Sequence, residues 1–259
     1  MDSSDFTLSS LRRFLAEQPD LSAEFWSAAD TRRGAAKLRQ EFEQKKQHLE
    51  QEKQRLQGLL QEENRWREQG YFWVAGVDEA GRGPLAGSVV AAAVILPPQV
   101  FLPGLNDSKK LSIAQREALA VSIKKTALAW SIQEASVAEI DRLNILEASL
   151  LAMRRAVESL EPAPEIILTD GNFPCLKGFG QEKTVIGGDQ KCACIAAASI
   201  LAKVARDHLM LEMDQLYPQY GFARHKGYGT PDHLAALSRY GACPLHRQSF
   251  GPIKDLGKQ

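Results

Sequence analysis

The stretch Gly76-Val77-Asp78-Glu79-Ala80-Gly81-Arg82-Gly83-Pro84 is the most informative part of this chain. It overlaps an apolar run, Tyr71–Val77, whose aromatic and β-branched residues predict a β-strand that ends in two adjacent carboxylates. A flexible, cationic Gly-Arg-Gly loop comes next. Adjacent acids at a strand end suit a divalent metal ion, and glycines allow a phosphate or a sugar to approach the backbone closely. The stretch therefore predicts metal-assisted chemistry on a nucleic acid backbone.

The bulk composition limits what the chain can be. Its 259 residues, 44% of them hydrophobic, can form one large domain or two smaller ones around a real core. The formal net charge is zero, so any nucleic-acid binding must come from a local patch. No apolar run is long enough for a transmembrane helix, and the acidic N-terminus lacks a signal-peptide pattern. The four cysteines fit no zinc spacing; reduced thiols and a cytoplasmic location are expected.

Residues 1–70 are predicted to form a separate helical extension. Residues 32–69 contain no proline and are dominated by strong helix formers, with opposite charges three or four residues apart, as in Glu41–Lys45. Their apolar positions are sparse, which indicates a narrow stripe on a long, solvated helix. A shorter amphipathic helix is expected at Leu8–Glu17. This extension is either a plain appendage or a module that contacts the substrate or a protein partner.

Residues 71–259 are predicted to form an α/β domain with a mixed central β-sheet flanked by helices and a C-terminal helical region. Three early strands are followed by strands that alternate with helices, which is typical of such a sheet. The expected strands are 71–77, 88–96, 128–135, 165–169 and 183–186, and the expected helices are 112–125, 144–160, 195–216 and 230–239.

Four carboxylates stand at the expected strand ends: Asp78, Glu79, Asp170 and Asp189. Strand ends are where open α/β sheets place their sites, so these acids are expected to converge. Mg²⁺ takes oxygen ligands and bridges to phosphate oxygens, and two such ions can activate a water and stabilise the leaving oxygen. The alternative is that each acid merely caps a turn or a helix. If the acids do converge, their repulsion should raise at least one pKa.

Further motifs follow in order along the chain. They are Asn106-Asp107-Ser108-Lys109-Lys110-Leu111, Asp170-Gly171, Gly188-Asp189, the segment 195–203, Arg206-Asp207, His225-Lys226-Gly227-Tyr228-Gly229-Thr230 and His246-Arg247. Together with residues 78–87, this ordered set resembles the bacterial type 2 ribonucleases H (ribonuclease HII) over about residues 71–252. Small departures at Ser88 and Gln190 touch no catalytic position.

The resemblance implies a ribonuclease H-like fold and a metal-dependent endonuclease. Such an enzyme cleaves the RNA strand of RNA–DNA hybrids and incises at single ribonucleotides embedded in duplex DNA, leaving 3′-hydroxyl and 5′-phosphate ends. It implies Mg²⁺ or Mn²⁺ as cofactor, held by Asp78, Glu79, Asp170 and Asp189. It also implies roles in ribonucleotide excision repair and primer removal. Type 3 ribonucleases H lack this Gly-Arg-Gly loop and the matching tyrosine, Tyr228, so type 2 is favoured.

Substrate-binding residues are also implied by the resemblance. The loop Gly81, Arg82 and Gly83 would read a 2′-hydroxyl together with Tyr228. Ser108 and Lys109 precede a helix. Because a lysine near a helix N-terminus is unfavourable for the helix dipole, its presence indicates that an anion binds there. Lys203 and Arg206 could also face the substrate, and Asp207 could pair with either. His225 and His246 are weaker candidates for substrate contacts, whereas His208 and His233 fit structural or surface positions.

Two other functions stay open at this point. One is a catalytically silent nucleic-acid-binding or scaffold protein, which the presence of all four carboxylates disfavours. The other is a different metal nuclease of the same fold, such as a junction resolvase, which the Gly-Arg-Gly loop and Tyr228 disfavour. The sequence does not fix the oligomeric state, and a monomer is the working expectation.

Overall fold

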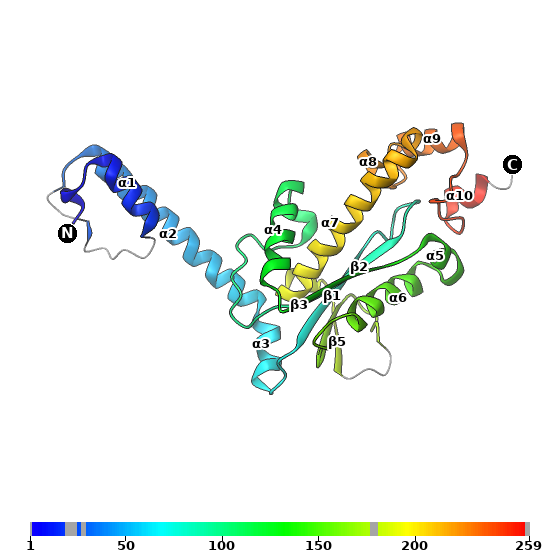
Figure 1. Cartoon of the computed structure of the whole chain (residues 1–259), viewed down its shortest axis with the longest axis horizontal. Coiled ribbons are helices and arrows are strands. Elements are labelled where there is room, and N and C mark those ends of the chain that lie inside the picture. Colours follow the sequence, from blue (N-terminus) through cyan, green and yellow to red (C-terminus); the bar gives the residue numbers. More distant parts are fainter. Residues whose placement is uncertain (1, 19–24, 27–29, 177–180, 257–259) are drawn as a thin grey trace. The chain divides into compact units, whose positions relative to one another are not determined.

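The computed structural model describes residues 2–18, 25–26, 30–176 and 181–256. The chain divides into two compact units, Met1–Arg55 and Leu56–Gln259. Figure 1 shows the helices and strands of both units.

The first unit is built on α1 (Leu8–Glu17) and the first part of α2 (Arg33–Leu59). The expected bounds of α1 are confirmed, and Thr7 caps it by accepting a hydrogen bond from the Ser10 amide at 3.2 Å. The unit has a hydrophobic core of its own, rich in aromatic rings: Leu11, Leu15, Phe25, Trp26, Ala35, Leu38 and Phe42. The narrow apolar stripe expected on a solvated helix is thus present in α2, and in this unit Ala35, Leu38 and Phe42 bury it.

The second unit is organised around a five-stranded mixed sheet in the order β3-β2-β1-β4-β5. Strand β1 pairs antiparallel with β2 and parallel with β4, and β4 pairs parallel with β5. The mixed sheet expected from the sequence is confirmed. The strands are β1 Val74–Ala80, β2 Val89–Ile95, β3 Ala129–Ala135, β4 Ile166–Asp170 and β5 Gln181–Val185.

Helices cover both faces of this sheet (Figure 1). On one face lie α7 (Ala193–Leu216) and α4 (Ile113–Thr126), and on the other lie α6 (Ile145–Glu158) and α5 (Val137–Leu143). Alternate residues of each strand point to opposite faces. In β1, Val74 belongs to the core beneath α7, whereas Ala75 belongs to the core beneath α6. The expected helices are confirmed, and α5, capped by Ser136, is an element that the sequence analysis missed.

Helix α7 approaches the sheet closely at Gly76 of β1. A Cβ atom on Gly76 would collide with the backbone of Cys194 and Ile195 at the start of α7. The alanines in the first two turns of α7 are buried and allow the same close approach along the helix. Gly76 therefore fixes where the N-terminus of α7 lies on the sheet.

The boundary between the two units lies earlier than the expected residue 70. Leu56, Leu59 and Leu60 belong to the core of the second unit. Helix α3 (Gln61–Glu68) follows, and its buried Glu63 accepts a hydrogen bond from the Cys194 amide at 2.8 Å. A carboxylate near a helix N-terminus stabilises that terminus. Residues 56–69 are thus part of the second unit, for tertiary reasons that composition cannot reveal.

The C-terminal region packs around a hydrogen-bonded pair of histidines. It contains α8 (Phe222–His225), α9 (Pro231–Tyr240) and α10 (Gly251–Leu256). The buried rings of His233 and His246 meet through their Nε2 atoms at 3.0 Å. The Cys243 amide donates to His246 Nδ1 at 2.9 Å, and His233 Nδ1 lies 2.9 Å from the Tyr228 carbonyl oxygen. Since a carbonyl only accepts, His233 must donate from Nδ1 and His246 from Nε2, so both rings are neutral.

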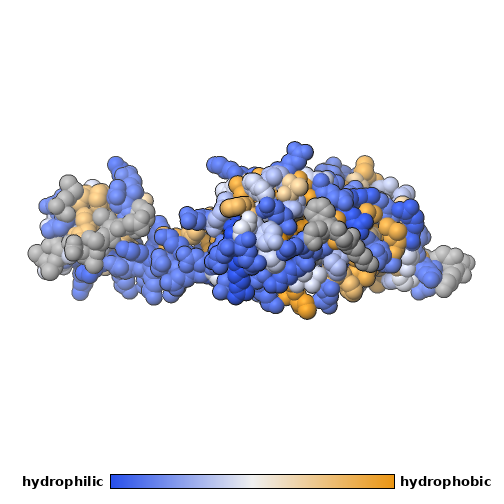
Figure 2. All heavy atoms as spheres, turned by 90° about the horizontal axis from the view of Figure 1, so that it is seen from below, coloured by the Kyte–Doolittle hydropathy of each residue, from blue (hydrophilic) through white to orange (hydrophobic). Residues whose placement is uncertain are grey.

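None of the described helices combines the length and the apolar character needed to cross a bilayer. On the face seen in Figure 2, the second unit is largely hydrophilic, with scattered hydrophobic residues. All four cysteines are buried, and none is joined to another by a disulfide.

Two truncations test the corrected boundary. A protein that starts at Arg55 should unfold cooperatively with stability close to that of the full second unit, because its core is intact. A protein that starts at Gly70 should be less stable by roughly 5 kcal/mol or more, since it loses the burial of three leucines. Urea unfolding followed by circular dichroism measures both. Equal stability of the two proteins would place residues 56–69 outside the core.

Acid should weaken the histidine pair. Burial lowers the pKa of His246 to about 4 and also lowers the pKa of His233. A base whose pKa is depressed on folding stabilises the protein above its unfolded pKa of about 6.5, and this stability is lost as the pH falls towards 4. We expect His246→Asn to lower the free energy of unfolding by about 1 kcal/mol at pH 7.5. Between pH 6.5 and 4 the variant should lose less unfolding free energy than the wild type does.

The matched control is His208→Asn, because the side chain of His208 is half exposed and pairs with Glu117. Urea unfolding at several pH values compares the variants. An acid dependence that is the same in His246→Asn and in the wild type would contradict the neutral pair.

Candidate active site

The four predicted carboxylates gather at one edge of the sheet. Strands β1 and β4 run parallel with Val77 beside Thr169, so Asp78 and Asp170 follow at the same edge. Asp189 lies in a short 3-10 turn, Gly188–Gln190, between β5 and α7. Asp78 and Glu79 lie within β1 rather than after it, because pairing with β2 continues as far as Ala80.

The charges of these acids oppose one another. Burial, followed by repulsion from Glu79 and Asp170, holds the pKa of Asp78 well above its ordinary value. Burial also raises the pKa of Glu79, with Arg82 opposing and Asp170 adding to the rise. Burial raises the pKa of Asp189 as well, with repulsion from Asp107 and Asp170. The expected rise is therefore confirmed, and the four acids form one electrostatic group.

Hydrogen bonds fix two of the carboxylates. The Gly188 amide donates to Asp170 Oδ1 at 2.7 Å, which ties the end of β4 to the turn that carries Asp189. The Glu79 amide donates to Asp78 Oδ1 at 2.7 Å. Neither bond occupies both oxygens of its carboxylate, so each acid keeps lone pairs that can bind a cation.

Two further residues of the site were not singled out from the sequence. Asp107 is buried and raises the pKa of Asp189, so a fifth carboxylate borders the group. Ser199 of α7 hydrogen-bonds Asp78, which opposes the rise in the pKa of that acid. The Asn-Asp-Ser sequence at 106–108 was a usable signal for Asp107, since such residues cap turns. Ser199 could not be found without knowing how α7 lies on β1.

The loop that follows β1 carries the predicted recognition residues. Gly81 has a φ of +100°, in the region that favours glycine, and a Cβ there would collide with Arg206. The half-exposed Arg82 donates to Glu79 at 3.4 Å. Tyr228 is 47% exposed, and its ring edge lies 3.5 Å from the position that a Cβ on Gly83 would take. The structure thus brings the Gly-Arg-Gly loop and the predicted tyrosine together beside Glu79.

Ser108 and Lys109 lie in a 3-10 turn, Ser108–Lys110, on the other side of the carboxylates. Ser108 is buried, and its hydroxyl lies 2.8 Å from that of Ser199. The buried position of Ser108 indicates that its side chain stabilises the turn. Direct contact of Ser108 with the substrate stays a prediction. Lys109 is exposed and lowers the pKa of Asp189 by its charge, so it borders the site from solvent.

Burial and contacts bear on four other residues singled out from the sequence. Arg206 and His246 are each only 1% exposed, so neither can face the substrate as suggested. Arg206 binds backbone carbonyl groups instead, including that of Ala86 at 3.2 Å. Asp207 pairs with Lys203 at 2.7 Å, as expected. His225 stacks on His233 with ring centroids 4.5 Å apart.

The carboxylate group is open rather than a closed metal cage. In the part of the chain that the structure describes, no three or more His, Cys, Asp or Glu side chains are arranged so that they could hold a metal ion by themselves. The donors are nonetheless all carboxylate oxygens, which suit Mg²⁺ or Mn²⁺ and not a soft metal. Mg²⁺ usually keeps several waters and takes substrate phosphates as further ligands, so an open group fits it.

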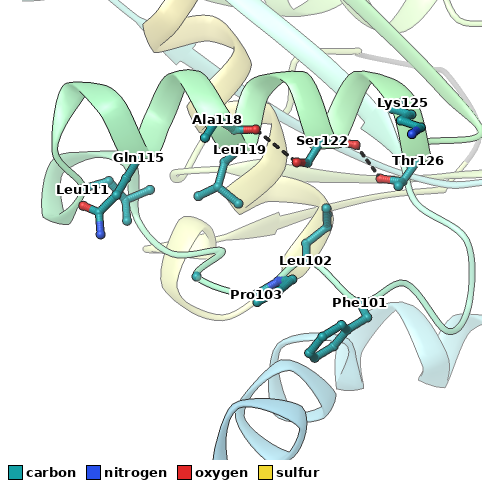
Figure 3. A pocket seen from close by; sticks show the side chains of 11 residues that line it. Phe101, Leu102, Pro103, Leu111, Gln115, Ala118, Leu119, Ser122, Lys125 and Thr126 are labelled. Atoms are coloured by element: carbon teal, nitrogen blue, oxygen red, sulfur yellow. Dashed lines mark hydrogen bonds between the residues drawn. The ribbon is translucent and has the colours of Figure 1, made fainter. Parts of the chain in front are cut away.

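A separate pocket of about 470 Å³ lies between α4 and the segment 101–104 (Figure 3). Figure 3 shows Phe101, Leu102, Pro103 and Leu119 around it. Its lining is mainly apolar and contains no carboxylate. The pocket is therefore distinct from the acidic edge of the sheet.

Comparison with known proteins assigns the family. Residues 75–252 match the profile of the family described as Ribonuclease HII. A ribonuclease HII of Pelotomaculum thermopropionicum is 50% identical over 99% of this chain and 97% of its own. One of Desulfitobacterium hafniense is 51% identical over 88% and 87%, and one of Bordetella pertussis is 60% identical over 71% and 91%.

Solved structures agree with this assignment. The ribonuclease H2 of Pyrococcus horikoshii OT3 has a TM-score of 0.61 and 27% identity, over 71% of this chain and 97% of its own. Bst ribonuclease HIII, solved with Mn²⁺, has a TM-score of 0.56 and 17% identity over 73% and 70%, and shows the shared fold alone. The chain therefore belongs to the ribonuclease HII family, divalent-metal-dependent hydrolases that act as endonucleases on the RNA of RNA–DNA hybrids.

Proposed function

We propose that this chain also incises at single ribonucleotides embedded in duplex DNA, and so starts their excision, in addition to removing RNA primers. The observation that carries the proposal is that cleavage and recognition groups adjoin. Asp78 and Glu79 lie on the strand that leads directly into Gly81–Gly83, and Tyr228 lies beside Gly83. Groups that recognise a 2′-hydroxyl, placed within a few residues of the reactive carboxylates, can direct cleavage to the one phosphodiester bond that follows it.

The four carboxylates would hold the metal ions. When bound, two divalent cations would supply the chemistry, since such ions can activate a water and stabilise the leaving oxygen. The amides of Gly188 and Glu79 hold Asp170 and Asp78 in place, so that their remaining oxygens are oriented for the ions. The products are a 3′-hydroxyl and a 5′-phosphate. Mutual repulsion among the acids supports this role, because cations relieve it.

The remaining residues would select the substrate. A 2′-hydroxyl both donates and accepts, so backbone groups of the loop and the Tyr228 hydroxyl can read it. The Tyr228 ring can stack on the sugar that follows the ribonucleotide. Lys109 and Arg82 are exposed cations on two sides of the acids, where they would contact phosphates.

The first unit would contact the hybrid or a protein partner. Its folded aromatic core supports a role beyond that of a plain appendage. The protein that starts at Arg55 distinguishes contact with the hybrid from contact with a protein partner. Loss of a nucleic-acid contact would reduce the salt dependence of hybrid binding. Four buried, unpaired cysteines support a reducing compartment, the cytoplasm.

Divalent metal should stabilise the protein through the carboxylates. Mg²⁺ or Mn²⁺ should raise the melting temperature of the wild type, because a ligand that binds only the folded state adds to stability. Asp78→Asn should lose most of this rise. In EDTA at neutral pH the variant should be more stable than the wild type by roughly 1 kcal/mol, since it no longer buries that charge.

Differential scanning fluorimetry with EDTA, Mg²⁺ and Mn²⁺ measures these shifts. Asp232→Asn is the matched control, because its carboxylate is 69% exposed and pairs only loosely with Arg224. Equal metal shifts in Asp78→Asn and in the wild type would remove Asp78 from the metal site.

Tyr228 should matter most where a single ribonucleotide must be found. We expect Tyr228→Ala to lower kcat/KM about 10-fold or more on a DNA duplex with one ribonucleotide, because stacking is worth about 1–3 kcal/mol. The loss on a long RNA–DNA hybrid should be smaller. Tyr240→Ala is the matched control, since Tyr240 is 49% exposed on the end of α9.

Both substrates are assayed with Mg²⁺, with Mn²⁺ and with EDTA, beside an all-DNA duplex. No incision of the single-ribonucleotide duplex by the wild type would refute the proposed function. Equal losses on both substrates would refute the role of Tyr228 in selection.

A further inference from the structure

Two buried arginines lie beneath the recognition loop. Arg247 is fully buried and Arg206 of α7 is 1% exposed. Arg247 donates to the carbonyl oxygens of Gly81 at 2.6 Å, Arg82 at 2.8 Å and Gly87 at 2.9 Å. The two guanidinium groups therefore lie under the whole loop that begins at Gly81.

Arg206 connects this loop to the turn that carries Tyr228. It donates to the carbonyl oxygen of Ala86 at 3.2 Å and to that of Lys226 at 3.1 Å. The Leu85 amide also donates to the Gly227 carbonyl at 2.8 Å. Loop and turn are thus bound to one rigid group as well as to each other.

Neither arginine has an acidic partner. No carboxylate among the described residues lies within salt-bridge distance of Arg206 or Arg247. Burial lowers the pKa of both groups, that of Arg247 to about 9, and the charge of Arg206 adds to this effect. Burying a cation without a counter-ion in direct contact is costly. The carbonyl dipoles offset part of the cost, and the more distant charges of Asp207 and Asp141 and the Phe250 ring beside Arg247 add to this. Such an arrangement is poor as a means of stability, which points to a functional reason for it.

The Arg247 contacts determine where the loop amides point. In a trans peptide the N–H lies opposite the preceding carbonyl. Because the carbonyls of Gly81 and Arg82 point at Arg247, the amides of Arg82 and Gly83 point away from it. Neither amide donates a hydrogen bond within the described residues. Two free donors therefore face outward from the loop, on a backbone that is held from behind.

We propose that Arg206 and Arg247 are positioning residues that hold the amides of Arg82 and Gly83, together with Tyr228, in a preorganised arrangement that recognises the ribose. This inference rests on the proposed function, since it assigns the parts that make selection possible. Neither arginine touches the substrate. Their planar guanidinium groups hold several carbonyls in fixed directions at once, which a lysine cannot do.

The test replaces each arginine by lysine, which keeps the charge and loses the planar group. We expect Arg247→Lys and Arg206→Lys to lower kcat on the single-ribonucleotide duplex about 10- to 100-fold, as small misplacements do. KM should change little, and the loss on an RNA–DNA hybrid should be smaller, so the preference for the single ribonucleotide falls. Arg155→Lys is the control, because Arg155 binds Glu139 and the Glu134 carbonyl away from the site.

Folding is measured separately by circular dichroism and by the melting shift with Mg²⁺, which should match the wild type. A wild-type kcat and preference in both lysine variants would overturn the inference. So would a loss in equal proportion on both substrates, because that is the result of a merely structural role. Failure of the proposed function would give a different result: the wild-type protein itself would not incise at a single ribonucleotide.

Discussion

The close contact between Gly76 and the start of α7 sets the geometry of the whole site. From Ile195 to Arg206 the helix rises about 1.5 Å per residue, and from Gly76 to Gly81 the chain of β1 advances about 3.3 Å per residue, so both spans are roughly 16 Å. Corresponding residues of α7 and β1 therefore stay side by side along the whole span. Ser199 meets Asp78, and Arg206 meets Gly81. One glycine thus places both a support for the carboxylates and a support for the loop.

Much of this arrangement could be predicted from local patterns. Apolar, β-branched runs predicted the strands, the order of strands and helices predicted the mixed sheet, and the expected helix starts at 112 and 230 coincide with the caps Ser112 and Thr230. The carboxylates were found because acids at the ends of neighbouring parallel strands must share an edge. The end of β1 was misplaced, since hydrophobicity falls at Asp78 while backbone pairing with β2 continues.

What could not be predicted depends on partners far along the chain. Arg206 is separated by 120 residues from the Ala86 carbonyl that it binds, and a charged residue on a helix is ordinarily expected at the surface. His246 was similarly expected near substrate, but it is paired with His233 in a buried contact. The boundary near residue 55 was hidden because leucines of one helix serve two separate cores. In each case the residue type can be read from the sequence, but the residue that it contacts is known only from the folded structure.

The two buried arginines have a consequence for how a neutral chain meets a polyanion. The formal net charge is zero, so the protein as a whole exerts little pull on nucleic acid at a distance. The two positive charges beneath the loop do not change this, because they are buried and donate to backbone carbonyls rather than to solvent. The loop is thus held in shape by cations that a phosphate cannot reach. Its rigidity is gained without adding a charged site that would grip any duplex regardless of its sugar.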